Sequence, residues 1–362
     1  MTMKILIATG GTGGHIFPAL AVAARLKENG HEVVFAGAFK NTRAWLGEEG
    51  YAFYELQAKG LSSESLKSFL DSCSSMIQSI LRTFCLLRRI RPDGVLGFGG
   101  YGAFPVVLTA AVCRYPTLIH EQNAVPGRAN RLLSPLVSGI AVSFERSRDF
   151  FPASKTKVTG CPCRATFLGL DREKALKDLE LRQDKRTLLV LGGSQGSLRI
   201  NSVFPQAASL LKEVTDFQVI HVTGQKDNDE FVRQYGALGI PCRVVPYLDD
   251  IARAYTACDL AISRAGAVTV TELALFGVPA VLIPYPFAGG HQKQNALVLQ
   301  ERGAAKIIEE QDLTPEVLRD HVLSFFTKGL GSQKVKESVQ DIVRPNAAAD
   351  LAREVVCLNR RM

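Results

Sequence analysis

The 362-residue sequence lacks the run of about 18 apolar residues that a membrane-spanning helix needs. Its opening residues, MTMKILIATGG, also lack the parts of a signal peptide and lead directly into an apolar, strand-like segment. The eight cysteines are scattered, and Cys161 and Cys163 do not have the spacing of a zinc-ligand pair. We therefore expect the protein to stay in the cytoplasm, with its cysteines reduced and mostly buried.

The sequence also lacks the composition of a disordered chain, because 46% of its residues are hydrophobic and 22% are charged. Its length exceeds one ordinary core and suits two domains of about 150 residues or more. The formal net charge of +8 is uneven, since residues 1–160 carry 18 Lys and Arg against 11 Asp and Glu. The N-terminal half is therefore expected to meet an anionic partner, either nucleic acid or an anionic membrane surface.

Apolar segments alternate with amphipathic, helix-like segments along the whole chain, which predicts parallel sheets built from βαβ units. Five strand-like segments precede residue 159, and the same pattern starts again after residue 164 with five more. The chain closes with RPNAAADLAREVVCLNRRM, a predicted helix with no strand after it. The fold class predicted is α/β, with two doubly wound domains that join near residues 159–164.

Two glycine-rich turns follow predicted strands, GGTGGH at residues 10–15 and GGSQG at residues 192–196. A turn of this kind at the carboxyl end of a parallel strand offers free N–H groups to an anion, and the hydroxyl of Ser194 would add a donor. Pro18 is expected in the first turn of the helix after the first loop. A plain tight turn is the alternative interpretation of both segments.

Two common nucleotide-binding sites do not fit these turns. A dinucleotide-binding turn needs a third glycine, which GTGGHI lacks, and an acid after the second strand, where the sequence has Ala36 and Gly37. Neither turn is followed by the Lys-Ser or Lys-Thr pair of a P-loop. These absences argue against a dehydrogenase and against a P-loop NTPase.

The segment SRAGAVTVTE, residues 263–272, predicts a strand end, a turn of small residues and a helix that carries Glu272. The N–H groups of this turn suit a diphosphate and the carboxylate suits both hydroxyls of a ribose, although Glu272 could instead only complement the helix dipole. His291, Gln292 and Asn295 follow in GGHQKQNA. These side chains suit sugar hydroxyls, or else they are solvated loop residues.

Five segments, GGTGGH, HEQNAVPGRANR, GGSQG, SRAGAVTVTE and HQKQNA, occur in this order across the chain. Together they resemble the MurG family, the UDP-N-acetylglucosamine:undecaprenyl-diphospho-muramoyl-pentapeptide N-acetylglucosaminyltransferases that convert lipid I to lipid II in bacterial cell-wall synthesis. The resemblance implies a GT-B fold of two Rossmann-like domains that face each other across a cleft. Residues 1–160 would form the acceptor and membrane side, residues 161–343 the UDP-GlcNAc side, and residues 344–362 a helix that crosses back to the first domain.

The resemblance also implies the site residues. Asn123 and Gln292 would bind the GlcNAc hydroxyls, Arg164 and Ser194 the donor diphosphate, Glu272 the ribose, and the backbone of Leu248 the uracil. CPCR replaces the more common GNPVR-like run before Arg164. The other implied donor contacts are Thr12, Gly13, Gly14, Ala267, Val268, Thr269, Val270 and Thr271, and the implied acceptor contacts are Gly13, Gly14, His15, Tyr101 and Asn130.

The implied reaction is an inverting transfer that needs no metal and no cofactor. It requires a base for the C4 hydroxyl of the acceptor and N–H dipoles or positive charge for the departing UDP. His15 is a candidate base because an imidazole with a pKa of ~6.5 is largely neutral at cytoplasmic pH and the adjacent helix N-terminus would lower that pKa further. Glu121 is the competing candidate, unless it orients the acceptor or is held by Arg128 or Arg131.

The remaining motifs and histidines of the sequence are consistent with this mechanism. No Asp-x-Asp motif with the character of a metal ligand stands at a strand end, so a metal-assisted departure of UDP is not supported. His31, His221 and His321 are expected to be structural. Another UDP-sugar enzyme of the same fold, such as a UDP-GlcNAc 2-epimerase, and a nucleotide-binding module without catalysis remain the alternative functions.

The sequence of residues 66–92 predicts an amphipathic helix that would lie on an anionic membrane surface. Arg82, Arg88, Arg89 and Arg91 lie beside or just beyond its apolar stripe, so the segment would hold the protein on the cytoplasmic face of the membrane as a peripheral protein. Packing of the stripe on the sheet is the alternative. The other expected partners are cell-wall synthesis proteins, with no role for nucleic acid. The stripe consists of Phe69, Cys73, Met76, Ile77, Ile80, Phe84 and Leu87.

Overall fold

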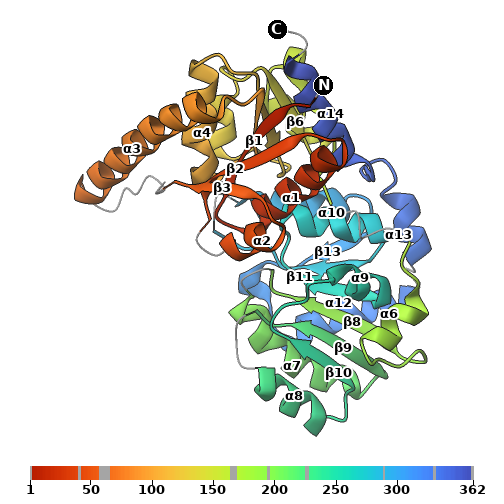
Figure 1. Ribbon diagram of the computed structural model, residues 1–362. Coiled ribbons are helices and arrows are strands. Elements are labelled where there is room, and N and C mark those ends of the chain that lie inside the picture. The colour runs from red at the N-terminus through yellow and green to blue at the C-terminus, as the bar shows by residue number, and fades with distance from the viewer. Residues whose placement is uncertain are drawn as a thin grey trace. The chain divides into compact units, whose positions relative to one another are not determined.

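The computed structural model of the chain describes residues 2–39, 42–56, 66–163, 169–193, 196–224, 228–287, 290–328 and 332–359. The chain divides into two compact units. The first unit comprises residues 1–164 together with 344–362, and the second unit comprises residues 165–343. Figure 1 shows a sheet flanked by helices in each unit.

The first unit contains a seven-stranded sheet in the order β3-β2-β1-β4-β5-β6-β7. Every strand pair is parallel. The order reverses between β1 and β4, and this switch point of a doubly wound sheet is where ligands bind beyond the carboxyl ends of the strands. The strands are β1 (Lys4–Gly10), β2 (Glu32–Ala38), β3 (Ala52–Glu55), β4 (Gly94–Gly97), β5 (Thr117–Glu121), β6 (Gly139–Val142) and β7 (Thr156–Val158).

Both faces of this sheet are covered, because successive side chains of β1 enter different cores. Ile5 and Ile7 belong to one core, with residues of the helices α1 (Gly13–Glu28) and α14 (Ala347–Asn359). Leu6 and Ala8 belong to another core, with residues of α3 (Leu66–Ile90), α4 (Gly100–Val112) and α5 (Arg128–Leu133). Alternation of side chains along a strand explains this division, and it requires the continuous apolar run that β1 has.

The C-terminal helix α14 packs on the first unit, although the second unit precedes it in the chain. Its Leu351 and Val355 are fully buried in the core that includes α1, and Figure 1 shows α14 in blue near the red strands and helix of the first unit. Lys157 of β7 forms an ion pair with Glu354 at 2.7 Å. The chain therefore returns to its first sheet at its end.

The second unit contains a six-stranded parallel sheet in the order β10-β9-β8-β11-β12-β13, which reverses between β8 and β11. The helices α7 (Leu198–Lys212) and α12 (Pro315–Lys328) contribute to its core, and α8 (Asn228–Ala237) contributes the buried Tyr235. The strands are β8 (Arg186–Leu191), β9 (Phe217–Val222), β10 (Cys242–Val245), β11 (Leu260–Ser263), β12 (Ala280–Leu282) and β13 (Ala305–Ile307). The other helices of this unit include α6 (Arg172–Asp178), α9 (Ile251–Ala257), α10 (Ala267–Phe276), α11 (His291–Gln300) and α13 (Ser332–Ser338), whereas α2 (Arg43–Glu48) belongs to the first unit.

Two local expectations are wrong. Pro18 is the sixth residue of α1 rather than part of its first turn, because the helix already begins at Gly13. A proline there removes only one backbone hydrogen bond, the one to the carbonyl of Gly14, so the helix continues. The cysteines are all free, but only Cys161 and Cys258 are buried, and Cys85 is exposed.

The face that α3 presents to the protein is polar along much of its length. Ser72, Ser79 and Thr83 are buried, whereas Ile77 and Leu81 are 59% and 61% exposed. Leu86 and Leu87 near the helix end are buried. The predicted apolar stripe therefore does not pack on the sheet as a whole, and its Phe69 lies outside the described side chains. Among the described residues, no helix is long and apolar enough to cross a membrane.

Candidate functional site

The switch point of the first sheet brings two glycine turns together. β1 ends at Gly10, and the turn continues through Gly11 and Thr12 into α1. β4 ends at Gly97, and Gly99 and Gly100 lead into α4. Thr12 is exposed and is the N-cap residue of α1, but its side chain makes no capping hydrogen bond. Its hydroxyl and the N–H groups of the first helical turn are thus placed to bind an anion.

His15 lies in the first turn of α1, beside the second glycine turn. A Cβ atom on Gly100 would lie 3.3 Å from Cδ2 and 3.4 Å from Nε2 of His15, and Gly100 has a φ of +80°, so this contact favours glycine. Burial lowers the pKa of His15 from the ordinary value of 6.5, and the nearby Glu121 carboxylate opposes this shift. A neutral imidazole at this edge can accept a proton.

The carboxylate of Glu121, at the end of β5, is buried and fully engaged by hydrogen bonds. Its Oε1 accepts from the backbone N–H of Asn123 at 2.9 Å and from Nδ2 of the same residue at 3.0 Å. Its Oε2 accepts from the N–H of Gly127 at 3.1 Å and from Nδ2 of Asn130 at 2.8 Å. Four donors occupy the lone-pair positions of one carboxylate, so Glu121 organises the loop that follows β5.

The predicted acceptor residues differ in exposure. Tyr101, in the first turn of α4, is 63% exposed. Asn130 is buried, and its Nδ2 also donates to the carbonyl of His120 at 3.2 Å, while its Oδ1 has no partner among the described residues. Asn130 is therefore held as part of the loop framework, and only its oxygen remains for a further bond.

His120 and Gln122 are polar residues of this site that the sequence reasoning missed. Nε2 of Gln122 lies 3.0 Å from the carbonyl oxygen of Phe98 and 3.2 Å from Nδ1 of His120. Nε2 of His120 lies 3.0 Å from the carbonyl oxygen of Gly160. Both residues are buried. Their position in HEQN, on either side of the singled-out Glu121, was the available signal.

The switch point of the second sheet has the same construction. β8 ends at Leu191, and the turn through Gly192, Gly193 and Gly196 leads to α7, whose N-cap residue Ser197 accepts from the N–H of Ile200. A Cβ atom on Gly192 would lie 2.1 Å from the backbone nitrogen of Ser197, so only glycine fits there. Ser194 lies outside the described residues, as does Arg164.

β11 ends at Ser263, and the turn of Arg264, Ala265 and Gly266 leads to α10. Arg264 pairs with Glu310 and donates to the carbonyl of Ile283 at 3.2 Å. This arginine therefore fixes the turn to the neighbouring chain segment. The second switch point thus also ends in two turns that open helices, which is the arrangement that a diphosphate requires.

Gln292, the second residue of α11, is oriented by two backbone groups. Its Oε1 accepts from the N–H of Ala265 at 3.2 Å and from that of Tyr285 at 3.0 Å. Asn295 is fully buried and donates to the carbonyl of Ala265 at 3.2 Å. The amide of Gln292 thus offers its NH₂ group to a ligand, whereas Asn295 stabilises the turn.

Glu272 lies in the second turn of α10, where the hydroxyl of Tyr255 donates to its Oε2 at 2.9 Å. Within the predicted run from Ala267 to Glu272, Ala267 and Val270 are buried and the other residues are partly exposed. Leu248 is partly exposed in the segment between β10 and α9. The described residues gather no three His, Cys, Asp or Glu side chains as a metal centre would need.

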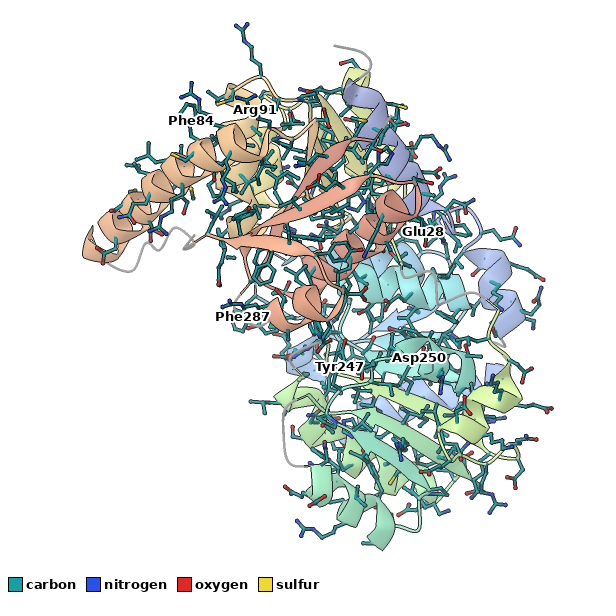
Figure 2. The ribbon with its side chains drawn as sticks, in the orientation of Figure 1. Glu28, Phe84, Arg91, Tyr247, Asp250 and Phe287 are labelled. Carbon is teal, nitrogen blue, oxygen red and sulfur yellow. The ribbon has the colours of Figure 1, made fainter. Side chains whose placement is uncertain are left out.

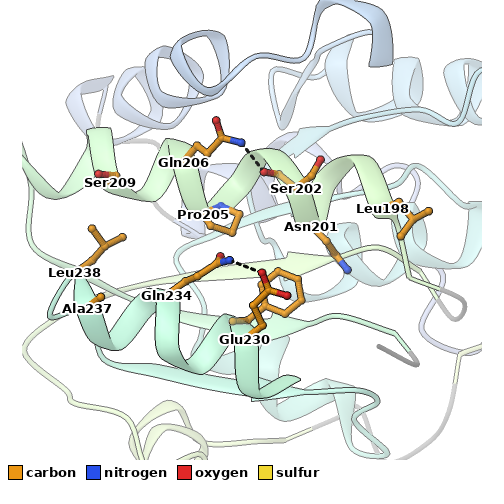
Figure 3. Close-up of a pocket in the computed structure, with 11 residues that line it drawn as sticks. Leu198, Asn201, Ser202, Pro205, Gln206, Ser209, Glu230, Gln234, Ala237 and Leu238 are labelled. Carbon is orange, nitrogen blue, oxygen red and sulfur yellow. Dashed lines mark hydrogen bonds between the residues drawn. The ribbon is translucent and has the colours of Figure 1, made fainter. Parts of the chain in front are cut away.

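A pocket of about 740 Å³ lies between α7 and α8 of the second unit (Figure 3). Gln206 donates to the carbonyl of Ser202 at 2.9 Å, and Gln234 donates to Glu230 at 3.0 Å. The residues described as lining it include no lysine, arginine or histidine, and Glu230 is their one charged side chain. A pocket of this charge does not suit a diphosphate.

Comparison with known proteins decides the family. Residues 5–142 match the N-terminal domain and residues 187–353 the C-terminal domain of glycosyltransferase family 28. The chain belongs to glycosyltransferase family 28. It is 37% identical to the UDP-N-acetylglucosamine--N-acetylmuramyl-(pentapeptide) pyrophosphoryl-undecaprenol N-acetylglucosamine transferase of Geobacter sulfurreducens, over 99% of this chain and 100% of that one.

Other relatives agree. The protein of the same name from Nitrosococcus oceani is 41% identical over 89% of each chain. The crystal structure of MurG from Acinetobacter baumannii is 30% identical and superposes with a TM-score of 0.79 over the full length of both chains. The two doubly wound units and this structural likeness confirm the predicted GT-B fold class. The predicted family and enzyme class are confirmed as well.

Proposed function

We propose that this family 28 enzyme transfers GlcNAc from UDP-GlcNAc to the C4 hydroxyl of the muramoyl sugar of lipid I and so forms lipid II. The observation that carries this proposal is the similarity of nearly the whole chain to proteins named UDP-N-acetylglucosamine--N-acetylmuramyl-(pentapeptide) pyrophosphoryl-undecaprenol N-acetylglucosamine transferase. Radiolabelled UDP-GlcNAc with lipid I should yield labelled lipid II, and absence of label in the lipid fraction would refute the activity.

A control reaction separates this function from an epimerase of the same fold. UDP-GlcNAc alone should remain intact with the transferase, because the inverting displacement needs the acceptor hydroxyl. An epimerase would isomerise or hydrolyse the nucleotide sugar without an acceptor. A nucleotide-binding module without catalysis would leave the label on the nucleotide in both reactions.

In this proposal His15 is the general base. Its pKa is lowered by burial, so the ring is neutral above that value and can take the proton of the attacking hydroxyl. Glu121 does not compete for this role, because each of its oxygens already accepts two hydrogen bonds. Its role is to hold Asn123 and Asn130 in place, so that the loop presents Asn123 to the sugar.

The second unit binds the donor in this proposal. Glu272 accepts the ribose hydroxyls while Tyr255 steadies its carboxylate, and Gln292 donates to a GlcNAc hydroxyl. The N-termini of α7 and α10 lie at the second switch point, where their dipoles would stabilise the diphosphate as it leaves. Arg164, Ser194, Leu248 and the run 267–271 remain predicted contacts of the donor.

The exposed face of α3 is the proposed contact with the anionic cytoplasmic leaflet. Ile77, Leu81 and Phe84 are exposed at helical spacing, and Arg88 lies 5.0 Å from the ring of Phe84. Figure 2 labels Phe84 and Arg91 near the C-terminal end of this helix. Apolar side chains flanked by arginines are typical of a helix that lies at a membrane surface.

This contact is testable by sedimentation with vesicles. Replacement of Arg88, Arg89 and Arg91 by Ser should reduce binding to anionic vesicles and make it less dependent on salt, because each arginine contributes about 1 kcal/mol near such a surface. Turnover with a soluble acceptor should be preserved. Unchanged vesicle binding by the folded triple variant would contradict this role.

A further inference from the structure

Hydrogen bonds connect Gly160, His120 and Gln122 in a chain, and the atom that carries the hydrogen can be assigned for each bond. The carbonyl of Gly160 can only accept, so Nε2 of His120 must donate to it across the 3.0 Å contact. Nδ1 of the neutral His120 ring is then an acceptor, and it receives a hydrogen bond from Nε2 of Gln122 at 3.2 Å. Burial lowers the pKa of His120 to about 4, so this ring remains neutral near neutral pH.

The orientation of the Gln122 amide is fixed by a second contact. Its Nε2 also donates to the carbonyl of Phe98 at 3.0 Å, and an amide oxygen in that position would face another acceptor. Both hydrogens of the NH₂ group are therefore directed to Phe98 and His120. The side-chain oxygen Oε1 of Gln122 is left on the other side of the amide, and it is buried without a partner among the described residues.

His15 likewise has one ring nitrogen without a hydrogen-bond partner, and this nitrogen complements the free oxygen of Gln122. Its Nδ1 is buried and has no hydrogen-bond partner in the described part of the chain, although the residue as a whole is partly exposed. The side chain of Gln122 and the carbonyl of Phe98 both act on the His15 ring, where each raises the pKa against the larger effect of burial. An unpartnered acceptor and an unpartnered ring nitrogen thus belong to neighbouring side chains.

We propose that Gln122 is a positioning residue whose Oε1 accepts a hydrogen bond from Nδ1–H of His15, so that Nε2 of His15 keeps its lone pair and faces the turn at Gly100. The hydrogen bond on one nitrogen of a histidine decides which nitrogen can act as the base. His120 acts one step further back, because it fixes the amide that fixes His15. This inference rests on the proposed role of His15 as the base, but the tautomer is measurable without any substrate.

Two substitutions of Gln122 separate its acceptor from its donors. Gln122→Met keeps the length of the side chain but removes both, whereas Gln122→Glu keeps an acceptor and removes the NH₂ group. Ser143→Ala is the matched control, because the Ser143 hydroxyl lies 3.5 Å from Nε2 of His120, at the far end of the same chain. Thermal unfolding of each variant shows whether it remains folded.

The decisive readout is a long-range ¹H–¹⁵N NMR spectrum of histidine-labelled protein, with the His15 signals assigned by their loss in His15→Ala. The wild type and Ser143→Ala should hold neutral His15 as the Nδ1–H tautomer. Gln122→Met should shift the population toward Nε2–H and lower kcat about tenfold or more, with the KM for UDP-GlcNAc unchanged within about twofold. Gln122→Glu should restore the Nδ1–H tautomer.

The pH profile gives a second signature. A carboxylate at position 122 favours the protonated form of His15 and raises its pKa, so the acid limb of kcat/KM should move to higher pH in Gln122→Glu and not in Gln122→Met. The titratable groups that act on His15 are otherwise Glu121 and His120. An Nε2–H tautomer in the wild type, or an unchanged Nδ1–H tautomer in folded Gln122→Met, would overturn the proposal. Failure to form lipid II with the tautomer shift intact would instead contradict only the proposed function.

Discussion

Each unit contains a network of hydrogen bonds around a buried histidine of one of its strands, His120 of β5 and His221 of β9, and the two networks differ in completeness. In the second unit, Nδ1 of His221 accepts from the hydroxyl of Tyr235 at 2.9 Å, and its Nε2 donates to Oδ1 of Asn201 at 3.2 Å. Asn201 in turn donates to the carbonyl of Thr223 at 2.8 Å. This network is closed, and burial lowers the pKa of His221 to about 3, so it is neutral and structural.

The network of the first unit is open. It runs from Gly160 through His120 and Gln122 toward His15, and it ends in the unpartnered atoms Oε1 of Gln122 and Nδ1 of His15 at the switch point of the sheet. A buried polar atom without a partner lowers stability, so it persists where function requires it. The comparison teaches that burial alone does not set the proposed base His15 apart from His221, whereas the open hydrogen-bond network and the position at the switch point do.

The largest effect is expected from a substitution that breaks the open network. His15→Ala should lower turnover by roughly 10²-fold or more and leave UDP binding nearly unchanged, because a general base acts in the transition state. Turnover is measured with lipid I and labelled UDP-GlcNAc, and UDP binding by calorimetry. Wild-type turnover in the variant would contradict the assignment and would make Glu121 the candidate base despite its four hydrogen bonds.

The next effect tests whether the second unit contributes to donor binding rather than to the proton transfer. Glu272→Ala should weaken UDP and UDP-GlcNAc binding alike by about 1.5–3 kcal/mol, as expected for hydrogen bonds to a charged group. Tyr255→Phe is the matched control, because it removes one donor from the carboxylate but keeps Glu272 itself. Unchanged UDP affinity in Glu272→Ala by calorimetry would show that the ribose role is wrong.

The smallest effect on function is expected where the closed network is opened. Tyr235→Phe removes the hydroxyl that donates to His221 and leaves Nδ1 of His221 unpaired, at a cost of about 1–3 kcal/mol of stability. The melting temperature should fall by roughly 2–4 °C per kcal/mol, while turnover at a permissive temperature should stay at the wild-type level. Scanning calorimetry measures the melting temperature, and the lipid II assay measures the turnover. Lost turnover without lost stability would place His221 in the function of the enzyme.

Comparison of the two sheets with the predicted strand segments shows which strands can be predicted from the sequence. The ten predicted strand segments all contain strands, and the prediction that one ends at Ser263 is confirmed. β3, β7 and β13 were not predicted. Each lies at an edge of its sheet, and Val158 and Ile307 at the ends of β7 and β13 are only partly buried. A short strand with one neighbour does not need the apolar run by which central parallel strands are recognised.

By itself the sequence determined the architecture and the family, because glycine turns after apolar strands leave few other folds for the chain and five ordered motifs resemble one family. Only the tertiary structure decided what the polar residues of HEQN do. Neighbouring residues of a strand end point to opposite faces, so Glu121 meets the loop donors while His120 and Gln122 meet Phe98 and Gly160. The donors to Glu121 lie 2 to 9 residues away along the chain, but Phe98 lies 24 residues from Gln122 and Gly160 lies 40 residues from His120, and no local pattern brings these residues together.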